Sequence, residues 1–208
     1  MAARDFFLDA TRKRVANTVE EIEKQTAAEI VVAVRRRCGR YGVVDVSTAA
    51  LLAFAALCAV VYLPQELNAN KLPEDVGIAF WASFALTTTI APLKRLLTPR
   101  SMMNANVRSA ARAAFHDMRI ARTRGRTGVL VFVSMFERKV EIVADIGVPV
   151  DSLGDGWRAA VAAMEAAGRR ADLDALLAAM KTMAPPLAAA LPVQPDDVDE
   201  LPNEPEVA

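Results

Sequence analysis

Residues 46–63 read VSTAALLAFAALCAVVYL, and residues 76–93 read VGIAFWASFALTTTIAPL. Neither stretch contains a charged residue, and each would form a helix about 27 Å long, close to the thickness of a bilayer's hydrocarbon core. A helix on the surface of a soluble domain keeps a polar face, which both stretches lack. The polar sequence PQELNANKLPED joins them. We therefore predict a transmembrane helical hairpin over 43–97, rather than two buried helices of a soluble bundle.

Basic residues flank this hairpin on its outer ends, where they could also meet anionic lipid head groups. They are Arg35, Arg36, Arg37, Arg40, Lys94, Arg95 and Arg100. The connection between the two stretches holds one base, Lys71. Because an excess of bases marks the cytoplasmic side of a membrane protein, this asymmetry predicts a multi-pass protein of the bacterial inner membrane with both termini in the cytoplasm. The first stretch also lies too far along the chain to be a signal peptide.

Composition excludes several classes of protein. The 208 residues carry 25 basic and 25 acidic side chains, and this zero balance argues against a nucleic-acid binder that acts through bulk charge. Two cysteines and one histidine are too few for a disulfide scaffold or a Cys/His zinc site. Residues 192–208, PVQPDDVDELPNEPEVA, hold six acids, four prolines and no base. Such a segment buries little apolar surface, so we predict a disordered acidic tail.

Apolar periodicity outside the hairpin predicts alternating helices and strands. Short β-branched runs predict strands over 29–34, 127–134 and 139–145. Apolar residues at helical spacing predict helices over 5–25, 101–121, 157–167 and 172–191, the last kinked or broken at its two adjacent prolines. The first strand precedes the hairpin and the others follow it. We therefore predict one discontinuous α/β domain over 1–42 and 100–191, interrupted by the membrane hairpin.

Three of these segments resemble the TPM domain family. They are TAAEIVVAV at 26–34, TGVLVFVS at 127–134 and ERKVEIVADIG at 137–147. The chain is most similar to bacterial membrane proteins of that family in which a hairpin interrupts the domain, and the likeness covers about residues 25–191. Ala27 stands where many members have a glycine. The resemblance implies a small sheet sandwiched by helices.

What the resemblance implies about function is varied. Plant relatives are thylakoid-lumen proteins linked to photosystem repair, with reported acid phosphatase activity. Some relatives bind calcium through acidic loop residues, and an animal relative is an auxiliary receptor subunit. Most bacterial members have no assigned reaction, and many relatives display the domain outside the cytoplasm, whereas the basic flanks here place it inside.

The acidic loop after the third predicted strand is the best candidate site. Asp145, Asp151 and Asp155 lie within a glycine-containing stretch, and carboxylates on such loops can gather around Ca²⁺ or Mg²⁺. The alternative is that Asp151 or Asp155 caps a helix. An arginine run could hold phosphate or lipid head groups, or form a solvated helix end: Arg119, Arg122, Arg124 and Arg126.

These observations leave three functions open. The first is a non-enzymatic interaction or accessory module for other membrane proteins, with membrane protein quality control as its setting. The second is a divalent-cation-dependent phosphatase that uses Asp145, Asp151 and Asp155. The third is a channel-like hairpin that forms a homo-oligomer through a stripe of small residues: Ala49, Ala53, Ala56 and Ala59.

Overall fold

Strand β1 (Glu29–Arg35) has the sequence EIVVAVR, and six of its seven residues are buried. It pairs in parallel with β2 (Gly128–Ser134) along its whole length, from Glu29 opposite Gly128 to Arg35 opposite Ser134. Strand β3 (Lys139–Ala144) is antiparallel to β2, and β4 (Glu206–Val207) is parallel to β1. The sheet therefore has the order β3-β2-β1-β4, and strands from both sides of the apolar hairpin lie next to each other in it.

The structure is a computed structural model that describes residues 8–62, 71–193 and 200–207. It divides into two units. One unit contains Met1–Cys38 and Asn104–Ala208 and is called here the α/β unit, and the other, Gly39–Met103, is called the hairpin unit. The α/β class, with a small sheet flanked by helices, is confirmed, while the membrane position of the hairpin stays a prediction.

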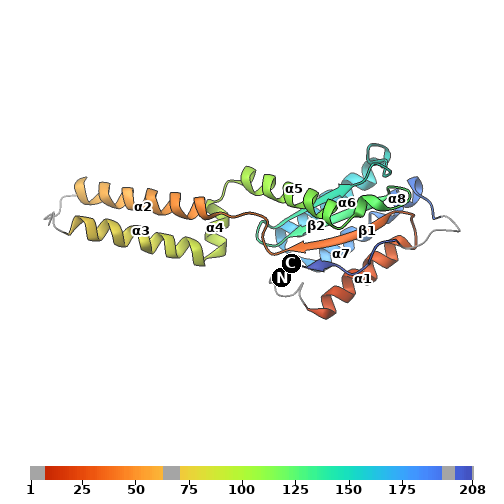
Figure 1. Cartoon of the computed structure of the whole chain (residues 1–208), viewed down its shortest axis with the longest axis horizontal. Coiled ribbons are helices and arrows are strands. Elements are labelled where there is room, and N and C mark those ends of the chain that lie inside the picture. The colour runs from red at the N-terminus through yellow and green to blue at the C-terminus, as the bar shows by residue number, and fades with distance from the viewer. Residues whose placement is uncertain (1–7, 63–70, 194–199, 208) are drawn as a thin grey trace. The chain divides into compact units, whose positions relative to one another are not determined.

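Helices cover both faces of the sheet (Figure 1). Because successive strand residues point to opposite faces, Ile30 and Val32 enter one core while Val31 and Ala33 enter another. Helices on the first face are α1 (Asp9–Glu23), α6 (Gly154–Arg170), α7 (Leu173–Lys181) and α8 (Ala184–Ala190). Helix α5 (Arg100–Asp117) supplies Val107, Ala111 and Ala114 to the second face.

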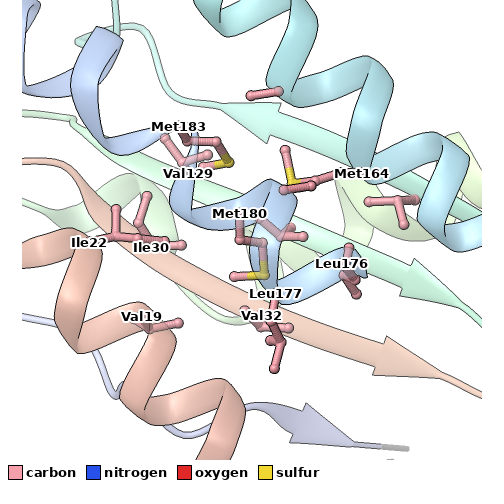
Figure 2. Close-up of a cluster of buried hydrophobic side chains, with 14 of the residues drawn as sticks. Val19, Ile22, Ile30, Val32, Val129, Met164, Leu176, Leu177, Met180 and Met183 are labelled. Atoms are coloured by element: carbon pink, nitrogen blue, oxygen red, sulfur yellow. The ribbon is translucent and has the colours of Figure 1, made fainter. Parts of the chain in front are cut away.

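The first core is the larger one. Figure 2 shows Val19 and Ile22 of α1 close to Ile30 of β1, with Met180 of α7 beside them. The helix predicted over 172–191, with a kink or break at its two adjacent prolines, is indeed broken into α7 and α8, and Pro185 and Pro186 lie in the first turn of α8. Proline lacks a backbone donor and is tolerated in a first turn, so the chain restarts there as a new helix.

The hairpin unit consists of α2 (Gly42–Tyr62), α3 (Leu72–Thr89) and the short α4 (Ala91–Leu97). Helix α2 is long and apolar enough to cross a membrane, and α3 with α4 passes the same test as a pair bent by 103°. The prediction of one continuous helix over 76–93 is therefore wrong at its end. Ile90 is extended, and Pro92 lies in the first turn of α4, where it starts a new helix. Most of the connection, 63–70, lies outside the described residues.

The acidic segment 192–208 also differs from its prediction. Residues Glu206 and Val207 form β4 opposite Ala33 and Val34 of β1, so the described part is not disordered. Composition suggested solvated charges, but Glu206 pairs with Arg35 at 2.8 Å. The three aspartates of the segment, Asp196, Asp197 and Asp199, lie outside the described residues.

Candidate functional site

Asp145, the first residue of the candidate acidic loop, is held by an arginine. It follows β3, and its side chain is only 3% exposed. Arg126 donates two hydrogen bonds to its carboxylate, from Nε at 2.7 Å and from Nη2 at 2.9 Å, and the Ile146 amide donates a third at 2.8 Å. The hydrogen bond from Arg126 is the main cause that holds the pKa of Asp145 below its usual value, against the opposing effect of burial.

The backbone around Asp145 and Arg126 is closely packed. The Gly147 amide donates to the Arg126 carbonyl at 2.9 Å, and a Cβ on Gly147 would lie 2.1 Å from the Gly125 carbonyl oxygen. Arg126 itself adopts a left-handed conformation with φ of 55°, which costs energy for a residue other than glycine. Asp145 and Arg126 therefore tie the loop after β3 to the loop before β2. This is a structural pairing that uses the carboxylate oxygens a cation would need.

The other two candidate carboxylates lie apart in solvent. Asp151 is exposed in a short 3₁₀ turn, and Asp155 is 97% exposed in the first turn of α6, where it pairs with Arg158 at 2.8 Å. Neither provides a side-chain cap for a helix, so the capping alternative is not seen. Among the residues that the structure describes, no three acidic, cysteine or histidine side chains gather in a way that could hold a metal ion.

This arrangement makes a prediction about divalent cations. Thermal melts of the detergent-solubilised protein should be unchanged by millimolar Ca²⁺ or Mg²⁺, because the described residues assemble no site for these cations. A cation that did bind only the folded state would raise the melting temperature. Asp151→Asn should melt like the wild type with and without the cations. A cation-dependent rise in melting temperature that Asp151→Asn abolishes would contradict the structure and restore the metal site.

A second prediction concerns acid. A carboxyl whose pKa is depressed in the folded state stabilises the fold above its unfolded pKa of about 4, and this stabilisation is lost as the pH falls through the folded value. Asp145→Asn should therefore cost about 2 kcal/mol at neutral pH, and its difference from the wild type should shrink below about pH 4. The measurement is urea unfolding followed by Trp157 fluorescence in a Trp81→Phe background. Asp151→Asn is the control, and an equal effect of both variants would contradict the assignment.

A buried polar cluster at the end of β2 was not foreseen from sequence. The Cys38 thiol donates to Ser134 Oγ at 3.2 Å, Ser134 donates to the Glu137 carboxylate, and the Cys38 amide donates to the other oxygen of that carboxylate at 3.0 Å. Burial is the main cause that raises the pKa of Cys38 to about 11. A thiol is nucleophilic as its thiolate, so the raised pKa disfavours the reactive form of Cys38 at neutral pH.

The predicted membrane-surface bases do not all lie on the surface. Arg36, Arg37, Arg40 and Arg100 are exposed. Arg95 is half-buried, and Arg35 pairs with Glu206. Lys94 is the clear correction, because its side chain is 9% exposed and its Nζ lies 2.7 Å from Asp45 Oδ2, on a carboxylate that is 4% exposed.

The arginine run does not form one cluster of free cations. Arg126 is bound to Asp145, and the Arg124 amide donates to the Glu200 carboxylate at 3.1 Å. Arg119 is exposed in a left-handed conformation before the short 3₁₀ helix Ile120–Arg122, and the side chain of Arg122 is exposed. The solvated interpretation therefore fits Arg119 and Arg122, and the phosphate interpretation has no assembled site.

Comparisons with known proteins give a fold and no activity. No family model matches the sequence, and no curated protein matches it. A solved structure similar to this chain is the NMR structure of the BA42 protein from the psychrophilic bacterium Bizionia argentinensis. The match has a TM-score of 0.57 and 17% sequence identity, and covers 97% of this chain and 94% of the other. At that identity the likeness shows the fold alone.

Proposed function

We propose that the protein is anchored in the bacterial inner membrane by the α2–α3 hairpin and that its α/β unit is a non-enzymatic interaction module in the cytoplasm. The observation that carries the anchor is the inverted burial of the hairpin unit. On α2, Ala49 and Ala53 are buried, whereas Leu51 is 67% and Phe54 is 62% exposed. Water-soluble folds bury large apolar side chains, and a contiguous exposed apolar surface of this kind fits lipid.

Helix α3 repeats this pattern. Trp81 is 66% exposed and packs edge-on against Phe80 and Phe84, with ring centroids 5.5 and 5.9 Å away. The hydroxyls of Thr87, Thr88 and Thr89 donate to carbonyls three or four residues earlier, which satisfies these groups without water. The three threonines near the end of the second apolar stretch are therefore compatible with a bilayer.

The proposal of an interaction module rests on the titratable groups of the α/β unit, which hydrogen-bond to one another. Asp145 with Arg126, and Cys38 with Ser134 and Glu137, are internal ties rather than groups directed at a ligand. The phosphatase alternative needs the three loop aspartates together, and they are apart. The resemblance to the TPM family supports an accessory role toward other membrane proteins, with membrane protein quality control as the setting.

The channel-like alternative also loses support within the hairpin. It relied on a small-residue stripe that would face a second copy of the chain. Ala49 and Ala53 belong instead to the buried side of α2, four residues apart, together with Asp45. Small residues at this spacing let two helices approach closely, and α3 packs against α2 along the hairpin.

Cysteine labelling in intact cells tests the topology. In a Cys38→Ser, Cys58→Ala background, a membrane-impermeant thiol reagent should label Asn68→Cys, in the connection between α2 and α3. It should label Asp155→Cys, on an exposed site of the α/β unit, only after the cells are permeabilised, since the basic flanks favour a cytoplasmic position for that unit. Labelling of Asp155→Cys in intact cells would overturn the orientation. Recovery of the protein in the soluble fraction would overturn the anchor.

A further inference from the structure

Within the described residues, the outer edge of β1 is only partly paired. On its inner side all seven residues pair with β2, but on its outer side only Ala33 and Val34 pair with β4. At the start of the strand the Ile30 amide donates to a side chain instead, the Glu23 carboxylate, at 2.8 Å. A strand edge whose donors and acceptors are not fully used by a ladder is a template for an added strand.

Residues 200–207, called here the strap, occupy this edge. Leu201 packs against the core under α5, and Val207 packs against the core on the opposite face of the sheet. Pro205, which lies between these two residues in the sequence, is also buried. The Leu201 amide donates a hydrogen bond to Glu29 Oε2 at 3.3 Å. The strap therefore behaves as a bound extended peptide, with apolar anchors on both faces of the sheet.

Charge complementarity adds to these anchors. Glu206 Oε1 lies 2.8 Å from Arg35 Nη2, and the Glu204 carboxylate lies 3.8 Å from Arg12. Glu200 accepts the amide of Arg124. Each acidic side chain of the strap thus meets a donor on the body of the α/β unit. The segment that lies on this edge is therefore acidic as well as apolar.

The strap is weakly held for a strand of this sheet. It makes two paired positions, and its two prolines cannot donate backbone hydrogen bonds. Its ion pairs are partly exposed, and such pairs contribute at most about 1 kcal/mol each. A segment of similar charge that paired further along β1 and lacked the prolines would form more hydrogen bonds on the same edge.

We propose that the outer edge of β1 is a docking site for an extended acidic segment of a partner protein, and that the strap occupies this site until the partner displaces it. The proposal names the partner chemistry for the interaction module proposed above and rests on that function. It does not depend on which side of the membrane the unit faces. A partner segment would add a parallel strand, with an acid that pairs with the side chain of Arg35 and apolar residues that enter the two cores.

Peptide binding to the detergent-solubilised protein tests the proposal. The probe is a fluorescent peptide of sequence LPNEPEVA, together with a version in which both prolines are threonine. A chain that lacks residues 200–208 should bind both peptides, the threonine version more tightly. The full chain should bind at least about tenfold more weakly, because a tethered competitor acts at an effective concentration near millimolar. No binding to the shortened chain at millimolar peptide, or equal binding to both chains, would overturn the proposal.

Charge reversal supplies the matched control. In the shortened chain, Arg35→Glu should weaken binding of the LPNEPEVA peptide and strengthen binding of LPNEPRVA, in which the acid that pairs with Arg35 is a base. Arg158→Glu, on the exposed end of α6, should change neither. Binding that follows total charge rather than position 35 would contradict a specific edge.

A further variant keeps the test valid if the shortened chain fails to fold. Glu206→Arg in the full chain keeps the strap but places two bases together, so peptide binding should rise above that of the full wild-type chain. Unchanged binding by a folded Glu206→Arg chain would count against displacement. Light scattering tests whether the edge is instead filled by the strap of a second copy of the chain. In that case the protein would form a concentration-dependent dimer, and the peptide would dissociate it. Neither failure would alter the labelling result for the membrane anchor.

Discussion

Lys94→Ala is expected to destabilise the hairpin unit by about 3–5 kcal/mol, the usual cost of removing one partner from a buried ion pair. Asp45 and Lys94 are both buried, and their charged atoms are 2.7 Å apart. The second carboxylate oxygen of Asp45 accepts no hydrogen bond within the described residues. Without Lys94, this carboxylate would lose its counter-charge in a site that water does not reach, where an isolated charge is very unfavourable.

Trp81 on α3 reports on this unit. In a Trp157→Phe background, thermal unfolding followed by its fluorescence should show an earlier transition for Lys94→Ala. Lys71→Ala, which removes an exposed lysine from the same unit, should leave the transition in place.

The double variant Asp45→Leu, Lys94→Met tests the cause. It removes both charges and keeps apolar volume, so it should recover much of the loss. If the double variant were as unstable as Lys94→Ala, the loss would come from packing of the lysine stem and not from the unpaired carboxylate.

The elements of the α/β unit could be predicted because each leaves a local pattern in the sequence. The run EIVVAV is β-branched over a length typical of a buried strand, and α1, α5 and α6 repeat apolar residues at helical spacing. The strand β4 leaves no such pattern. It is two residues long, and it forms because β1 offers an edge and Arg35 a counter-charge, both of which lie far away in sequence.

The candidate site shows the same limit. Three aspartates within eleven residues form a cation-like motif in sequence, but a motif does not reveal what already occupies its oxygens. Arg126 is 19 residues before Asp145, and the antiparallel pairing of β2 with β3 brings the two together. Lys94 was likewise placed among surface bases, because a base beside an apolar stretch resembles a lipid contact until the bend after Thr89 is known.

Replacing residues 41–99 by a flexible linker is expected to give a water-soluble α/β unit, because the replacement removes the proposed membrane anchor. Neither hydrophobic core contains a residue from this range, so the substitution removes none of the packing that surrounds the sheet. Strand β1 still reaches its parallel neighbour β2 through α5, and a parallel pair needs only a crossover of that kind.

Fractionation of cells gives the first measurement. The full chain should be in the membrane fraction and the linker variant in the soluble fraction, with far-UV circular dichroism and a cooperative melt to show that it is folded. Linkers of about 8 and about 16 residues guard against a span that is too short, since a flexible linker's reach grows with the square root of its length.

Val131→Asp in the linker variant is the matched negative control. It places a charge in the first, larger core, between the sheet and helices α1, α6, α7 and α8, so this chain should lose the cooperative melt. A linker variant that is unfolded at both lengths would mean that the sheet depends on the hairpin unit for its stability. A linker variant that folds but stays with the membrane would mean that the α/β unit has a membrane partner of its own, and the strap's edge on β1 would be the first surface to test for it.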